Sequence, residues 1–153
     1  MRPVRNSAKA IIIHQGKLLA LEFLDQQGPW FQLPGGGQQP GETLHQALIR
    51  ECLEEVNASV KVGELQLVRE YIASNHEFAE ENPGFHQIEF MFICEILNTS
   101  EVGAGHDTDE GQLNVVWLEI DRLEDLRLYP MAIRPMIKAQ KWETTPVYLG
   151  DVN

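Results

Sequence analysis

The sequence contains few of the features that mark secreted or membrane proteins. It has only two cysteines, Cys52 and Cys94, which is too few for a disulfide framework or a cysteine-based metal site. Apolar runs such as Ala10–Ile13 are far shorter than the roughly 18 residues that span a bilayer, and the basic start Met1–Arg5 is not followed by the apolar stretch of a signal peptide. We therefore expect reduced core thiols, no membrane partner and a cytoplasmic location.

Basic residues are also scarce. The chain has 12 Lys and Arg against 23 Asp and Glu, which gives a formal net charge of −11. Non-specific binding to nucleic acid depends on neutralising phosphates with Lys and Arg, so we expect no nucleic-acid partner. The same negative charge would repel a small phosphorylated ligand, unless a divalent cation lies between the two.

The chain shows no internal repeat and no linker, and 153 residues suffice for one domain, residues 1–153. Strand-like segments outnumber helical ones, which predicts an α+β (mixed α/β) fold. We expect strands at residues 8–14, 17–23, 30–33, 60–62, 65–72, 85–96 and 115–120, a polar loop at 98–114, and short helices at 121–126 and 130–142. The tail at 144–152 is also strand-like and could pair with a second copy, so a homodimer is possible.

The best-defined element is a helix that starts after Thr43. Thr43 and Gln46 have the spacing of a capping box, and Asn57 tolerates the left-handed conformation that ends a helix. The residues expected to face the core are Leu44, Leu48, Ile49, Cys52, Leu53 and Val56. Before this helix, three consecutive glycines at 35–37 predict irregular backbone.

Three glutamates in the later turns of this helix carry the strongest chemical signal. Glu51, Glu54 and Glu55 are spaced i, i+3 and i+4, so they share one side of the helix. Their mutual repulsion would be relieved by a cation, and oxygen ligands on a rigid element suit Mg²⁺ or Mn²⁺. Arg50 can hold neighbouring carboxylates by paired hydrogen bonds. A Glu pair alone would indicate only a solvated helix face, but here glycines, Glu42 and Arg50 accompany it.

The segment Gly36–Ala58 resembles the Nudix box, a signature of 23 residues. Its specified positions are the glycine, Glu42 and Arg50-Glu51-x-x-Glu54-Glu55. The family pattern continues with glycine and an aliphatic residue, where this sequence has Asn57 and Ala58, and Cys52 occupies a position that is usually aliphatic. The resemblance extends more loosely along most of the chain and implies an α/β/α sandwich with a mixed central β-sheet.

The resemblance also implies an activity: Mg²⁺-dependent hydrolysis (with Mn²⁺ possible) of a phosphoanhydride bond in a nucleoside diphosphate linked to another group. By the same resemblance, Glu51, Glu54 and Glu55 would bind the metal together with the Gly35 carbonyl. Glu51, Glu54 and Arg50 would be the catalytic residues, with Arg50 orienting the carboxylates. The substrate could be an ADP-ribose-like sugar nucleotide, a nucleoside triphosphate or a dinucleoside polyphosphate, and the box does not separate them.

Two carboxylates are candidates for the general base. Glu51 is one candidate, and Glu110 in the acidic loop is another, although a solvated loop residue is the simpler interpretation of Glu110.

Candidate substrate-binding residues lie outside the helix. Trp30 and Phe31 could stack on a base, or simply fill the core. Arg5 and Lys9 could meet phosphate, or serve only as surface charges. Glu89 alternates with Phe90 along a strand, so its side chain points towards solvent or a cleft.

Two other classes of function fit the same sequence. A nucleotide-binding sensor could keep the fold without catalysis, although the box carboxylates are all present. A structural protein could carry the acidic helix only as a surface, in which case Mg²⁺ would not affect its thermal stability.

Overall fold

The computed structural model describes residues 2–105, 108 and 110–153, so residues 106, 107 and 109 of the predicted loop lie outside the described part of the chain. The α+β prediction is confirmed. The α-helices are α1 (Leu44–Val56) and α2 (Arg134–Ala139), and the strands are β1 (Arg5–Ile11), β2 (Ile13–His14), β3 (Lys17–Asp25), β4 (Gly28–Gln32), β5 (Gly35–Gly37), β6 (Val60–Ile72), β7 (His86–Ile96), β8 (Asn114–Glu119), β9 (Leu128–Tyr129) and β10 (Tyr148–Asp151).

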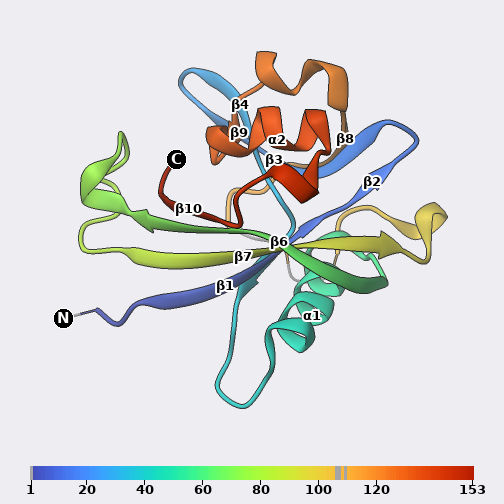
Figure 1. The fold of residues 1–153 in the computed structure, drawn as a ribbon, viewed down its shortest axis with the longest axis horizontal. Helices are drawn as coiled ribbons and strands as arrows, with labels where there is room; N and C mark the ends of the chain where they lie inside the picture. The colour runs from blue at the N-terminus through green and yellow to red at the C-terminus, as the bar shows by residue number, and fades with distance from the viewer. Residues whose placement is uncertain (1, 106–107, 109) are drawn as a thin grey trace.

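These strands form two sheets that lie between α1 and α2 (Figure 1). The first has the order β10-β6-β7-β1-β5 and is mixed, because β1 runs parallel to β7 and β10 runs parallel to β6. The second has the order β2-β3-β4-β9, with β8 paired to β3. The predicted mixed sheet is therefore present, and the second sheet was not predicted.

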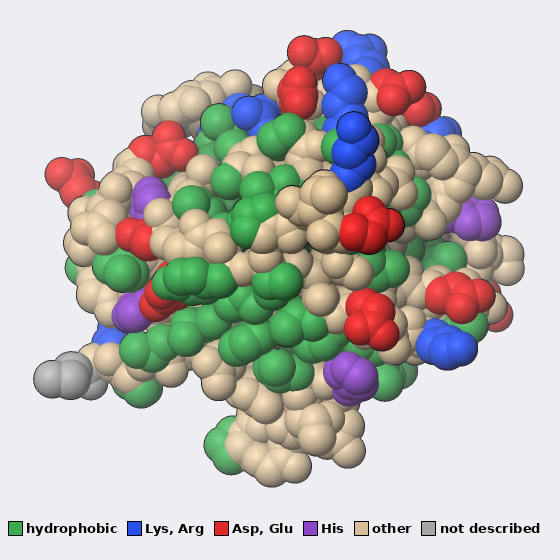
Figure 2. All heavy atoms as spheres, viewed as in Figure 1, with side chains coloured by type: hydrophobic (Ala, Val, Ile, Leu, Met, Phe, Trp, Pro, Cys, Tyr) green, Lys and Arg blue, Asp and Glu red, His purple; other side chains and the backbone are tan. Residues whose placement is uncertain are grey.

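The two hydrophobic clusters follow from alternation along the strands. In β3, Leu19 and Leu21 pack in the cluster beneath α1, while Leu18 and Ala20 pack in the cluster that includes Ile137 of α2. Strands buried on both faces need apolar residues at successive positions, which explains the continuous apolar run in β3. On the face seen in Figure 2, hydrophobic side chains also gather over β6, β7 and β1.

The helix α1 confirms the predicted ends. The Thr43 side chain accepts a hydrogen bond from the Gln46 amide, the Gln46 side chain accepts one from Thr43, and Asn57 is left-handed at φ 53°. The predicted apolar face was partly wrong. Ile49 and Leu53 are 46% and 45% exposed, whereas Glu55 is fully buried.

The glycines at 35–37 do not form irregular backbone. They form β5, which pairs with β1 in antiparallel fashion through Lys9, Ala8 and Ser7. The prediction failed because glycine has low strand propensity, and here contacts with the rest of the protein override it. A Cβ atom on Gly35 would lie 2.0 Å from the Ala8 carbonyl oxygen, so the close approach of these strands requires glycine.

The tail forms a strand, as predicted, but β10 pairs with β6 of the same chain. A homodimer therefore loses this support from the tail and stays a prediction. Both cysteines are free thiols buried in the core, as predicted, and burial raises the pKa of Cys94 to about 12. Across the described residues, neither α-helix has the length and apolar character needed to cross a membrane.

Candidate functional site

Arg50 is the centre of a hydrogen-bond network on α1. Its Nη2 lies 2.7 Å and its Nε 3.1 Å from the two carboxylate oxygens of Glu42. Its Nη1 lies 2.9 Å from Glu51 Oε1 and 3.2 Å from Glu54 Oε2, and its Nη2 also donates to the Gly37 carbonyl at 3.0 Å. Hydrogen bonds from Arg50 and from the Gln39 amide hold the pKa of Glu42 below its usual value. One guanidinium thus fixes three carboxylates and the end of β5.

The glycine strand brings these carboxylates against the sheet. The Gly35 amide donates to Glu55 Oε1 at 2.8 Å. A Cβ atom on Gly36 would lie 2.6 Å from the Glu51 carboxyl carbon, so the carboxyl group occupies the space that a side chain would take. The structure therefore brings together residues 35, 51 and 55, which the sequence analysis grouped on the basis of resemblance.

The predicted metal ligands are the carboxylates of Glu51, Glu54 and Glu55 and the carbonyl of Gly35. Such a set of oxygen atoms suits a hard divalent cation. Among the side chains that the structure describes, however, no three His, Cys, Asp or Glu groups converge as a metal site. Glu51 and Glu54 both turn to Arg50, and Glu55 turns to the Gly35 amide. The predicted ligands are therefore neighbours, arranged here around Arg50 and β5.

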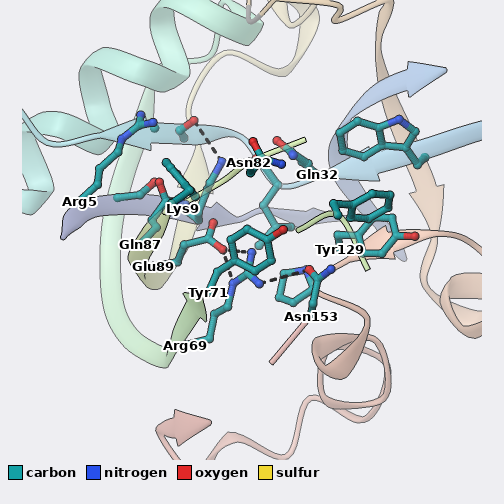
Figure 3. A pocket seen from close by; sticks show the side chains of 18 of the residues that line it. Arg5, Lys9, Gln32, Arg69, Tyr71, Asn82, Gln87, Glu89, Tyr129 and Asn153 are labelled. Carbon is teal, nitrogen blue, oxygen red and sulfur yellow. Dashed lines mark hydrogen bonds and ion pairs between the residues drawn. The ribbon is translucent and has the colours of Figure 1, made fainter. Parts of the chain in front are cut away.

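On its other side, β5 borders a pocket of about 560 Å³, a size typical of sites for small ligands. Gly35 and Gly36 form part of its wall. Glu51, Glu54 and Glu55 are not among the lining residues, so the glycine strand separates the carboxylates from the pocket. Figure 3 shows the pocket with its polar and aromatic side chains.

The end of the pocket beside β5 is basic. The Arg5 guanidinium lies so close to Gly37 that a Cβ atom there would be 2.5 Å from Arg5 Nη2. Lys9 Nζ donates to the carbonyls of Leu33 and Gly35 at 3.5 and 3.4 Å. Both predicted phosphate-binding candidates thus line the pocket next to the glycine strand, where Figure 3 also shows them.

The opposite end is aromatic. Trp30 lines the pocket. The centre of its ring lies 6.0 Å from the centre of the Tyr129 ring, which lies 5.7 Å from the centre of the Phe78 ring. Phe31 does not line the pocket. It points to the other face of β4 and packs in the core with Leu128, so its prediction as a substrate contact is not supported.

Glu89 lies on the pocket wall, buried, and forms an ion pair with Arg69. The sequence alone did not point to Arg69 or to other lining residues from distant segments, namely Ser7, Gln32, Tyr129 and Asn153. The pairing of β6 and β7 is the signal that could have found Arg69. In this hairpin Ile72 faces His86, and the same register continued outward places Arg69 opposite Glu89.

Glu110, the alternative candidate base, is exposed in a turn. Its loop reaches the C-terminal end of α1, where the amide of Gly105 donates to the Glu55 carbonyl at 3.0 Å and the Gln112 side chain donates to the same oxygen at 3.3 Å. Gly105 and Gln112 thus contact the backbone at Glu55, whereas Glu110 is exposed.

Comparison with known proteins gives one sequence relative of interest. An ADP-ribose pyrophosphatase of Methanocaldococcus jannaschii is 33% identical over 82 residues, which cover 54% of this chain and 44% of that protein. The match thus spans less than half of the relative's length.

Solved structures with the same fold cover nearly the whole chain. A NUDIX hydrolase from Nitrosomonas europaea superposes with a TM-score of 0.69 at 20% identity, covering 99% of this chain and 79% of that one. An ADP-ribose pyrophosphatase from Streptococcus suis gives 0.60 at 17% identity, covering 97% and 100%. The MutT protein from Methanosarcina mazei gives 0.68 at 18% identity, covering 95% and 98%.

The family comparison agrees with both the fold and the glutamate helix. The family model for the NUDIX domain matches residues 4–140, which include β1, the glycine strand, α1 and all of the pocket's lining residues except Asn153. The chain belongs to the NUDIX family.

Proposed function

We propose that the protein hydrolyses a phosphoanhydride bond in a nucleoside diphosphate linked to another group, in a reaction that depends on Mg²⁺. The observation that carries this proposal is the position of β5. The glycines lie between the α1 carboxylates on one side and the pocket end that carries Arg5 and Lys9 on the other. A nucleotide in the pocket would have its phosphates at the glycine strand, next to the carboxylates.

Glu51, Glu54 and Glu55, together with the Gly35 carbonyl, would hold the cation. When bound, it would neutralise phosphate charge and lower the pKa of a bound water. Arg50 keeps Glu51 and Glu54 in place through its hydrogen bonds. Arg5 and Lys9 bind the phosphate oxygens on the pocket side. These two local positive charges allow a protein with a negative net charge to bind phosphate.

Water attacks phosphorus, the bridging P–O bond breaks, and the leaving phosphate departs with the bridging oxygen. A carboxylate accepts the proton of the attacking water. Glu51 is the better placed of the two candidates, because its carboxyl group lies against Gly36 on the pocket wall, whereas Glu110 is in an exposed turn. Trp30 is positioned to contact the base at the far end of the pocket.

The test is a hydrolysis screen with and without Mg²⁺, run in parallel on ADP-ribose and other sugar nucleotides, nucleoside triphosphates and dinucleoside polyphosphates, with products identified by mass. The sequence relative named ADP-ribose pyrophosphatase makes ADP-ribose the first substrate to try. Glu54→Gln should lower kcat by about 10²-fold, while Glu95→Gln, an exposed glutamate on β7, should have no effect.

Full Mg²⁺-dependent activity in Glu54→Gln would contradict the assignment of this carboxylate. Tight nucleotide binding by the wild-type protein without release of phosphate products would instead support a sensor that keeps the fold but not the chemistry.

A further inference from the structure

The pocket contains most of the buried polar side chains of the described structure. Five polar or charged side chains are buried there or in the core, and four of them line this pocket: Ser7, Lys9, Arg69 and Glu89. Burying a charged group is costly unless the group is paired or binds something. Lys9 is accounted for by the carbonyls and the phosphate end of the pocket, which leaves the other three.

Ser7, Glu89 and Arg69 form one row across the central sheet. Ser7 on β1 pairs with Glu89 on β7, and Glu89 pairs with Arg69 on β6. Residues paired in this way point to the same face of a sheet, and neighbouring strands are about 4.8 Å apart. Because Ser7 is also opposite Gly37, the row begins at the glycine strand and leads away from it. Glu89 therefore lies two strands away from β5, where the charged ends of the Arg5 and Lys9 side chains lie, and one strand away from β1, which carries both residues.

Each of the three nitrogens of the Arg69 guanidinium contacts the protein. Its Nε and Nη2 both contact Glu89 Oε1, its Nη1 donates to the Val152 carbonyl at 2.6 Å and to Asn153 Oδ1 at 3.3 Å, and its guanidinium lies 5.0 Å from the centre of the Tyr71 ring. Arg69 is thus a positioning residue. Its contacts with Glu89 that the structure describes all reach Oε1, so Oε2 is the oxygen available to a ligand (Figure 3).

A carboxylate in direct contact with the phosphates would repel them. It accepts hydrogen bonds from O–H and N–H groups. In a nucleotide whose phosphates lie at β5, the groups that reach Glu89 belong to the nucleoside, namely the hydroxyls of the sugar and the N–H groups on the edge of the base. Burial strengthens such bonds, since water competes less for the carboxylate.

We propose that Glu89, held in place by Arg69, binds hydrogen-bond donors of the nucleoside and thereby determines which nucleotides the protein accepts. This inference rests on the proposed function, since it assumes that the pocket holds a nucleotide. It predicts that the protein distinguishes two nucleotides that differ by a single donor, and that the distinction depends on Glu89.

The experiment measures kcat/KM for pairs of substrates that differ in one donor. ATP and dATP differ in the 2′-hydroxyl, and GTP and ITP differ in the 2-amino group of the base; ADP-ribose and its 2′-deoxy form replace the first pair if the screen selects sugar nucleotides. We expect wild-type protein to prefer one member of at least one pair, and Glu89→Gln to reduce that preference about tenfold, because bonds to charged groups are the strong ones. A change in the first pair identifies the sugar, and a change in the second identifies the base.

The controls separate this inference from misfolding and from the proposed function. A ratio of kcat/KM values does not depend on how much of the variant is folded. Glu95→Gln makes the same substitution on an exposed part of the same strand and should leave both ratios unchanged. Arg69→Lys keeps a positive charge but loses the planar contacts, so it should shift the same ratio as Glu89→Gln and in the same direction.

Ratios in Glu89→Gln that equal those of the wild type for both pairs would overturn the inference while leaving the hydrolase proposal intact. If the wild-type protein hydrolyses no substrate, the hydrolase proposal fails by itself. The same ratios are then measured as Kd values by calorimetry, with the same expectation and the same overturning result.

Discussion

The two sides of the glycine strand β5 are built in different ways. On the α1 side, the interacting groups come from residues 35–55, and one guanidinium bonds to Glu42, Glu51, Glu54 and the Gly37 carbonyl. On the pocket side, the lining residues range from Arg5 to Asn153 and come from seven strands, the adjoining loops and the C-terminal tail, with at most three residues from any one strand. Displacing one residue on the α1 side should therefore abolish most of the activity, because the groups there hold one another in place. Substitutions on the pocket side should each reduce substrate binding by a smaller amount.

The largest effect is expected from Gly36→Ala. The new Cβ atom would lie 2.6 Å from the Glu51 carboxyl carbon, so the carboxyl group must move. Displacing one preorganised charged group costs about 10³-fold in kcat at the upper end, and we expect an effect of this size. Steady-state hydrolysis kinetics of the purified variant measure it.

Gly103→Ala is the matched control, since a Cβ atom there meets nothing within 4 Å, and it should behave as wild type. Nucleotide binding in the pocket should survive Gly36→Ala. An equal loss of binding and turnover would show that the two sides of β5 are not separate.

A smaller loss is expected from Arg50→Lys. Lysine keeps the charge but cannot bond to both oxygens of Glu42 and also reach Glu51 and Glu54. We expect kcat to fall by about 10²-fold, with a modest fall in melting temperature. Arg122→Lys, at an exposed arginine, is the control. Activity within twofold of wild type would mean that the carboxylates keep their positions without the multiple hydrogen bonds from the Arg50 guanidinium.

On the pocket side, Arg5→Gln should weaken substrate binding and leave the chemistry almost unchanged. Arg5 lies at Gly37 and is exposed, so the lost phosphate contact is partly screened by solvent. We expect KM to rise about tenfold at low salt, with kcat within threefold of wild type. The matched control is Arg2→Gln, an exposed arginine that does not line this pocket. A fall in kcat without a rise in KM would place Arg5 on the catalytic side of β5.

The smallest effect is expected on the stability of the tail, where Asp151 of β10 anchors the strand next to β6. Burial alone would raise the pKa of Asp151, but hydrogen bonds from Asn75, the Ile72 amide and His76 outweigh it and lower the pKa to about 2. The unfolded carboxyl group titrates near 3.8, so this stabilisation is complete above that pH and disappears as the pH falls towards 2.

Urea unfolding between pH 5 and pH 2 should show this loss, about 1–2 kcal/mol in the free energy of unfolding after allowance for partial exposure. Asp151→Asn should lack that part of the pH dependence. Asp121→Asn, at an exposed position, should keep it. Identical profiles for wild type and Asp151→Asn would contradict the role of Asp151 in holding the tail.

Sequence reasoning succeeded where structure depends on near neighbours. The capping box of Thr43 and Gln46 and the left-handed Asn57 occur as predicted, because each depends on contacts within a few residues. Features that depend on packing between distant segments were predicted wrongly. Ile49 and Leu53 have helical spacing suited to the core, yet they are exposed, and the side of α1 that carries Glu55 packs against the glycine strand instead.

The same limit explains the errors around the pocket. Trp30 and Phe31 are adjacent and equally aromatic, and only the packing of β4 decides that Trp30 faces the pocket and Phe31 the core. The glycines were predicted to be irregular because no local signal shows that β1 would pair with them so closely. The strand at the tail was visible in the sequence, but its partner β6 was not.

By itself, the sequence determined the glutamate helix, both of its ends, Arg50 as the partner of the glutamates, and the resemblance to the family. These features depend on residues within about 20 positions of one another or on helical periodicity. Only the tertiary structure decided that β5 separates two sites and that Glu89 meets Arg69 and the tail. Strand register joins residues 20 to 84 positions apart, as in the contacts of Arg69 with Glu89 and Asn153, and it is set by side-chain packing over the whole sheet.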